Sequence, residues 1–158
     1  MWYKKSAEFL TAFAVVCVML MSFCALSFAS PEALSPEIES TASGLITIKA
    51  PETELLSTTN KFLPVSASAP QGVVVTIYRY SAASNTYNKL YSDGAPLEAA
   101  VGATMLFASQ VELFQGSNKF IVRSAYDDNT YQIARFEVNL LNERFMDKIR
   151  SIAGILFN

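Results

Sequence analysis

The fold class of this chain is decided by the stretch Val73–Tyr80, which reads Val-Val-Val-Thr-Ile-Tyr-Arg-Tyr. Seven of its eight residues are β-branched or aromatic, and these residue types favour strands. Pro70-Gln71-Gly72 before it and residues 81–86 after it are typical of turns. We therefore predict a strand over residues 73–80, bounded by a turn on each side.

Alternation of apolar and polar residues extends from this strand in both directions along the chain. It predicts further strands over residues 45–49, 63–69, 87–91, 104–113, 120–126 and 131–140. In the last of them Ala134, Phe136, Val138 and Leu140 are expected to point inward. About seven short strands separated by turns predict an all-β fold, an antiparallel β-sandwich over residues 44–141.

The end of the chain changes to a helical period. Asn142 is a suitable helix cap, and the apolar residues that follow it at helical spacing are Phe145, Ile149, Ile152 and Leu156. We predict a C-terminal amphipathic helix over residues 142–158. Three roles stay open for it: packing on its own sandwich, lying on a membrane, or docking to a partner.

The start of the chain has the layout of a secretory signal. Lys4 and Lys5 precede an apolar run over residues 9–28, and Ser27 and Ala29 are small residues at its exit. We predict a signal peptide, helical in its apolar run, over residues 1–29, with cleavage between Ala29 and Ser30. Because about twenty apolar residues also span a bilayer, an uncleaved N-terminal anchor is the alternative.

Residues 30–43 join the signal to the sandwich. They mix proline, serine and glutamate with few large apolar side chains. This composition predicts a flexible, mildly acidic linker.

Composition excludes several classes of function. The chain has no histidine, and its two cysteines, Cys17 and Cys24, lie inside the signal, so the mature chain has neither a thiol nor an imidazole. A phosphate-binding glycine loop and a G-x-S-x-G elbow are also missing. We therefore expect no enzyme, no catalytic residue and no cofactor.

Charge argues against nucleic acid as a partner. Removing Lys4, Lys5 and Glu8 from the 12 basic and 14 acidic residues leaves 10 against 13, a net charge of minus three. Such a balance supplies no basic footprint for phosphates.

Two groups of residues are candidate sites. Asp127, Asp128 and Asn129 carry the oxygen ligands that calcium prefers, although the same residues favour hairpin turns, which is the interpretation we prefer. Tyr78 and Tyr80 share one face of a strand and form a candidate platform for a sugar or a peptide. Tyrosine is also an ordinary residue of half-exposed strands.

One stretch resembles a known family. Val111-Glu112-Leu113, Gly116-Ser117-Asn118-Lys119-Phe120-Ile121-Val122 and Ala125-Tyr126-Asp127 are similar to the corner and penultimate strand of bacterial immunoglobulin-like domains. Ala69-Pro70-Gln71-Gly72-Val73 is similar to the turn into their third strand. The resemblance covers roughly residues 44–140 and implies an Ig-like or cadherin-like β-sandwich. An extra residue near Arg123 and Ser124 predicts a β-bulge there.

Domains of this family serve as spacers, adhesins, carbohydrate-binding modules and enzyme appendages. Together with the predicted signal and the composition, the resemblance favours a secreted or envelope-located, non-enzymatic module, for binding a protein or glycan or for structural spacing at the bacterial cell envelope or outside the cell. The alternative is an accessory protein tethered to a membrane or a complex through residues 142–158 or an uncleaved N-terminus.

Overall fold

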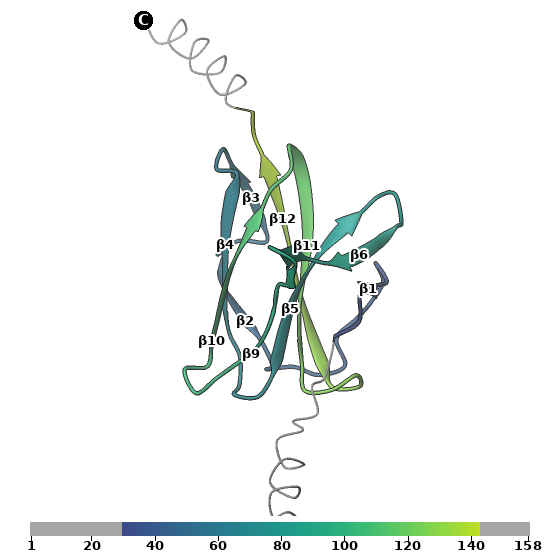
Figure 1. Ribbon diagram of the computed structural model, residues 1–158, viewed down its shortest axis with the longest axis vertical. Coiled ribbons are helices and arrows are strands. Elements are labelled where there is room, and N and C mark those ends of the chain that lie inside the picture. The colour runs from purple at the N-terminus through teal and green to yellow at the C-terminus, as the bar shows by residue number, and fades with distance from the viewer. Residues whose placement is uncertain (1–29, 143–158) are drawn as a thin grey trace, which may run out of the picture.

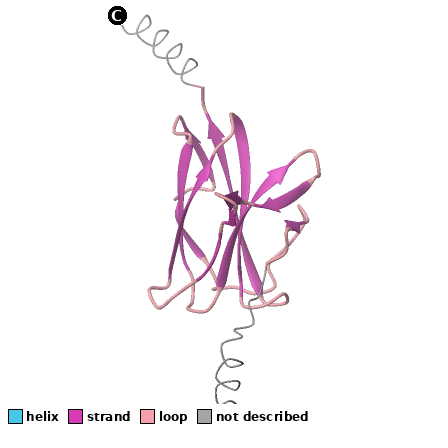
Figure 2. Ribbon diagram, viewed as in Figure 1, coloured by secondary structure: helices cyan, strands magenta, loops and turns pink. Residues whose placement is uncertain are grey.

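The computed structural model describes residues 30–142, which contain strands and turns but no helix (Figures 1 and 2). The strands are β1 (Ala33–Leu34), β2 (Thr47–Ala50), β3 (Leu55–Thr58), β4 (Phe62–Ser68), β5 (Val74–Ser81), β6 (Thr86–Lys89), β7 (Tyr91–Ser92), β8 (Ala95–Pro96), β9 (Glu98–Ala100), β10 (Leu106–Glu112), β11 (Gly116–Ala125) and β12 (Tyr131–Leu140). The predicted all-β fold class is confirmed. The predicted signal helix and C-terminal helix lie outside the described residues.

The strands form two main sheets. The larger has the order β1-β6-β5-β11-β12-β3, with β9 also pairing with β5, and the smaller has the order β10-β4-β2. All pairs are antiparallel except β3 with β12, which is parallel. The two sheets lie face to face (Figure 1), an arrangement consistent with a β-sandwich. A small hairpin, β7 with β8, turns through Asp93 and Gly94, both at positive φ.

The core lies between the two sheets and is built from side chains of both. Its buried members include Val65 on β4, Phe107 on β10, Ile77 on β5 and Phe120 on β11. Phe120 is fully buried and stacks on Phe136, with ring centroids 5.1 Å apart. Alternation along β4, β10 and β12 therefore places one side of each strand in this core.

A second apolar cluster covers the outer face of the larger sheet. It contains Leu34, Tyr78, Tyr87, Ile121 and Ile133. Leu34 belongs to residues 30–43, which we call the N-terminal segment. Strand β1 of that segment pairs with β6.

The prediction of a flexible linker over residues 30–43 is therefore wrong. The segment has few apolar side chains of its own, but the sheet supplies the apolar surface on which Leu34 is buried. Backbone pairing holds its other end, where the N–H groups of Thr41 and Ala42 both donate to the carbonyl of Tyr131 at 3.0 Å. Composition alone does not predict that such a segment is ordered, because the backbone of any sequence can form hydrogen bonds with a sheet.

The predicted bulge near Arg123 and Ser124 is also wrong. Strand β11 pairs with β5 and β12 without a shift of register, whereas the irregularity of this fold lies in β2, between Ile48 and Ala50. The buried Ser124 hydroxyl donates to the carbonyl of Leu45 at 2.7 Å. A polar side chain therefore fits inside a regular ladder because it finds an acceptor there.

Asn118 holds the corner between β10 and β11 through its side-chain amide. Asn118 is buried, and its Oδ1 accepts the N–H of Phe114 at 2.8 Å. Its Nδ2 donates to the carbonyls of Phe114 and Gly116 at 2.7 and 2.9 Å. One side chain thus replaces the backbone partners that the tight corner lacks.

Candidate functional site

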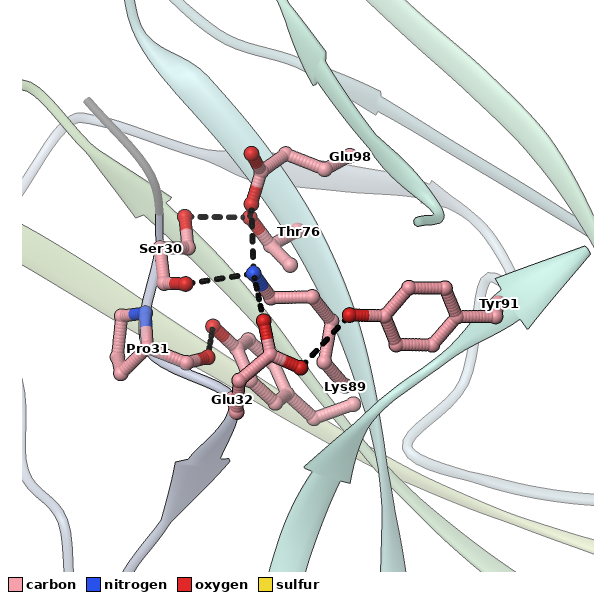
Figure 3. Close-up of polar contacts among 8 residues, drawn as sticks. Ser30, Pro31, Glu32, Thr76, Lys89, Tyr91 and Glu98 are labelled. Carbon is pink, nitrogen blue, oxygen red and sulfur yellow. Dashed lines mark hydrogen bonds and ion pairs between the residues drawn. The ribbon is translucent and has the colours of Figure 1, made fainter. Parts of the chain in front are cut away.

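A network of polar side chains joins the N-terminal segment to the larger sheet (Figure 3). We call it the N-terminal polar cluster, and its members are Ser30, Pro31, Glu32, Thr76, Tyr78, Lys89, Tyr91 and Glu98. They come from segments far apart in the sequence: the N-terminal segment, β5, the end of β6, β7 and β9. Only the folded sheet brings them together.

Lys89 is the centre of this cluster. Its side chain is only 4% exposed, and its Nζ lies 2.5 Å from the carbonyl oxygen of Ser30. Carboxylate oxygens of Glu32 and Glu98 lie 3.1 and 3.5 Å from the same nitrogen. An ammonium group has three N–H donors, and three oxygens surround this one.

Ser30 is buried as well and enters the cluster through its side chain. Its Oγ lies 2.7 Å from Oγ1 of Thr76, and Thr76 in turn donates to Oε2 of Glu98 at 3.0 Å. A threonine hydroxyl has one proton, so Ser30 must be the donor to Thr76. Ser30 therefore donates to Thr76, and Thr76 donates to the carboxylate of Glu98.

Hydrogen bonds shift the pKa values of Glu32 and Tyr91 in the outer part of the cluster. Tyr91 donates its hydroxyl to Oε2 of Glu32 at 2.7 Å. That bond, followed by the one from Lys89, holds the pKa of Glu32 below its ordinary value. The same bond raises the pKa of Tyr91, because it is stronger when Glu32 is charged and Tyr91 is neutral.

The described contacts of Lys89 are all with groups of the chain itself. A nucleophilic lysine needs a neutral amine with access to substrate, and Lys89 is enclosed by acceptors and accompanied by two carboxylates. The chemistry it performs is therefore recognition of the chain's own Ser30 and Glu32. The cluster fastens the N-terminal segment to the domain.

The two tyrosines proposed as a ligand platform have different surroundings. Tyr78 is fully buried, and its hydroxyl donates to the carbonyl of Pro31 at 2.8 Å. Burial raises the pKa of Tyr78 far above its ordinary value. Tyr80 is half-buried, packs on Tyr87 with ring centroids 5.3 Å apart, and donates to Asn85. A ligand on this face therefore reaches Tyr80 but not Tyr78, which the N-terminal segment covers.

The residues proposed as calcium ligands lie together in the turn between β11 and β12. Oδ1 of Asp127 accepts the N–H groups of Asn129 and Thr130 at 2.8 and 2.7 Å, and these bonds lower its pKa. This is the geometry of an aspartate that closes a turn. Asp128 is exposed beside it. Within residues 30–142, no group of three or more acidic residues is placed to hold a metal ion.

Of the predicted cleavage residues, Ala29 lies outside the described residues, while Ser30 is buried in the cluster. Sequence reasoning missed Lys89 and Glu98. The one available signal was that Lys89 shares a strand face with Tyr87, but a lysine on such a face is ordinarily solvated.

Comparisons with known protein families, with curated proteins and with solved structures found no match. The described part of the chain also has no helix long and apolar enough to cross a bilayer. The described residues form an all-β domain whose N-terminal segment is held on one sheet by the buried Lys89.

The cluster predicts an acid sensitivity that depends on Glu32. Its pKa is lower in the folded state than in the unfolded state, so its contribution to stability is complete above its unfolded pKa and is lost as pH falls through the folded value. In urea unfolding, the wild type should lose stability below about pH 4.3, the ordinary pKa of glutamate. The variant Glu32→Gln should lose less over the same range. Glu39→Gln, an equal change of charge in the same segment, should keep the wild-type acid dependence; equal curves for the two variants would contradict this role of Glu32.

Proposed function

We propose that this protein is an exported, non-enzymatic module of Ig-like fold, which acts in binding or structural spacing at the bacterial cell envelope or outside the cell. The strand order supports the fold assignment. β2, β4 and β10 share one sheet, as the A, B and E strands of Ig-like domains do. β6, β5, β11 and β12 are consecutive in the other, as the C′, C, F and G strands are.

The burial of Ser30 is the observation that limits where the predicted signal can be cut. Cleavage between Ala29 and Ser30 keeps every member of the N-terminal polar cluster in the mature chain. A cut only two residues later would remove the Ser30 carbonyl from Lys89 and the Pro31 carbonyl from Tyr78. The predicted signal thus ends one residue before the first member of the N-terminal polar cluster.

The chemistry of the described residues supports a non-enzymatic role. The chain has no histidine, and its buried lysine is held by acceptors from its own backbone and side chains. General acid–base catalysis needs a group that is free to exchange a proton with substrate. Surface recognition of a protein or a glycan makes no such demand.

Fractionation of the natively expressed protein, with the intact mass of each species, tests this proposal. We expect a soluble extracytoplasmic species that begins at Ser30. The variant Ala29→Phe should block cleavage, because the residue before the cut must be small, whereas Ala25→Phe within the apolar run should not. A membrane-bound species that retains Met1 would contradict cleavage and favour the tethered accessory protein. A cleaved species that stays with the membrane would favour tethering through residues 142–158.

A further inference from the structure

A groove runs between the free edge of β10 and the β7–β8 hairpin. Its volume is about 580 Å³. Residues 109–112 of β10 form one wall, and the lining also includes Phe62, Arg79, Tyr91, Asp93 and Phe114. We call it the β10 groove.

Strand β10 is an edge strand, and the direction of its backbone groups follows from two hydrogen bonds. Ala69 donates to the carbonyl of Met105, and Leu113 donates to the carbonyl of Lys61. Odd-numbered residues of β10 therefore bond to β4, and Ala108, Gln110 and Glu112 direct their N–H and C=O groups to the other side. Within residues 30–142 no strand pairs with that side.

Arg79 supplies a positive charge to the groove. Its guanidinium lies over the ring of Phe114, 4.2 Å from the centroid, and donates to the carbonyl of Glu112 at 2.5 Å. That bond agrees with the direction assigned to Glu112. In the part of the chain that the structure describes, Arg79 has no carboxylate within 4.0 Å, and its buried Nε has no hydrogen-bond partner. The carboxylate that interacts electrostatically with Arg79 is that of Glu112, which is already paired with Lys61 at 2.6 Å. A partly buried guanidinium with an N–H left over is the kind of group that a ligand carboxylate satisfies.

Exposed aromatic side chains border the groove. Phe62, Tyr91 and Phe114 are 47%, 52% and 64% exposed, although large apolar residues are ordinarily covered. All three line the groove, so they offer apolar contacts to side chains of a bound extended backbone.

We propose that the β10 groove binds an extended acidic peptide of a partner protein, which adds as a strand to β10 and places a carboxylate against Arg79. The inference rests on the proposed binding role and names the chemistry of the partner. A peptide fits better than a glycan, because outward N–H and C=O groups recur every second residue along β10, which matches the repeat of a second strand. The Nε–H of Arg79, which has no hydrogen-bond partner in the described part of the chain, adds the preference for an acidic segment.

Selection from a phage-displayed library of random heptapeptides on the purified full chain tests this inference. Enriched peptides should carry an acidic residue within alternating β-branched or aromatic residues. Gln110→Pro removes an outward N–H and leaves the ladder to β4 intact, so it should weaken their binding about tenfold or more. Gln110→Thr keeps the N–H and should bind normally.

A second pair of variants tests the charge. Arg79→Met keeps an apolar side chain beside Phe114 but removes the cation, and it should also weaken binding about tenfold or more. Lys119→Met, an equal change of charge on another part of the sheet, should not. Far-ultraviolet circular dichroism of each variant shows whether it is folded.

Three results would overturn the inference: no enriched peptide, equal binding to wild type and Gln110→Pro, or a dimer of the chain alone that Gln110→Pro abolishes. The last would make a second copy the occupant. Failure here is separable from failure of export, because the selection uses purified protein. If the chain is exported but selects no peptide, only the proposal of the β10 groove is contradicted. If the chain is retained in the cell but selects acidic peptides, only the proposal of export is contradicted.

Discussion

Replacing Lys89 with methionine is expected to lower the free energy of unfolding by about 3 kcal/mol, measured by urea denaturation at neutral pH. Methionine fills much of the same space, so the loss is electrostatic. Glu98, whose side chain is only 17% exposed, would keep its charge without the ammonium, and the carbonyl of Ser30 would lose its donor. Removing one partner of a buried pair is costly because the remaining charge stays desolvated.

The ion pair between Lys61 and Glu112 provides the control for this prediction. Its nitrogen and oxygen lie 2.6 Å apart, but both side chains are more than half exposed, so Lys61→Met should cost less than about 1 kcal/mol. The double variant Lys89→Met with Glu98→Gln should recover part of the loss, because no charge is then buried alone. If Lys89→Met were as mild as Lys61→Met, the N-terminal polar cluster would not hold the segment.

Replacing Phe120 with alanine is expected to lower the free energy of unfolding by about 4 kcal/mol. Phe120 is fully buried between the sheets, stacks on Phe136 and is packed within the main core cluster. Its removal exposes a cavity in a region whose strands pair on both sides, so β11 cannot collapse to fill it. Equilibrium unfolding in urea, followed by circular dichroism, measures the loss.

Phe62→Ala is the matched control for Phe120→Ala. It deletes the same side chain from the first residue of β4, where Phe62 is about half exposed, and should cost no more than about 1 kcal/mol. Similar losses for the two variants would mean that the space between the sheets is not the main core. Phe120→Leu keeps most of the buried volume and should fall between them, which separates loss of packing from failure to fold.

Local alternation of side chains was sufficient to predict most of the strands. The runs over residues 63–69, 104–113 and 131–140 correspond to β4, β10 and β12. Of the predicted inward residues of β12, Phe136, Val138 and Leu140 are buried, and Ala134 is partly buried against the core. A half-buried strand can be predicted from sequence because successive side chains point to opposite faces, one apolar and one polar. Tyr78 and Tyr80 were placed on one face for the same reason.

Strands with weak patterns were missed. β3 has the sequence Leu-Leu-Ser-Thr with Leu55 exposed, and it pairs parallel to β12 across more than eighty intervening residues. β1 is two residues long and lies in a segment whose composition is typical of a linker. Such strands exist because a neighbouring edge supplies hydrogen-bond partners, and that edge is not visible locally.

The sequence by itself determined the all-β class, the period-two strands, the turns, the absence of histidine and the absence of cysteine from residues 30–142. Only the tertiary structure decided that residues 30–43 pack on the sheet, that Tyr78 is covered and that Lys89 is buried. Lys89 and Ser30 are 59 positions apart, and their contact depends on how β6 and the N-terminal segment meet on one sheet. Burial of a charge requires partners, and in this chain those partners come from segments that folding alone brings together.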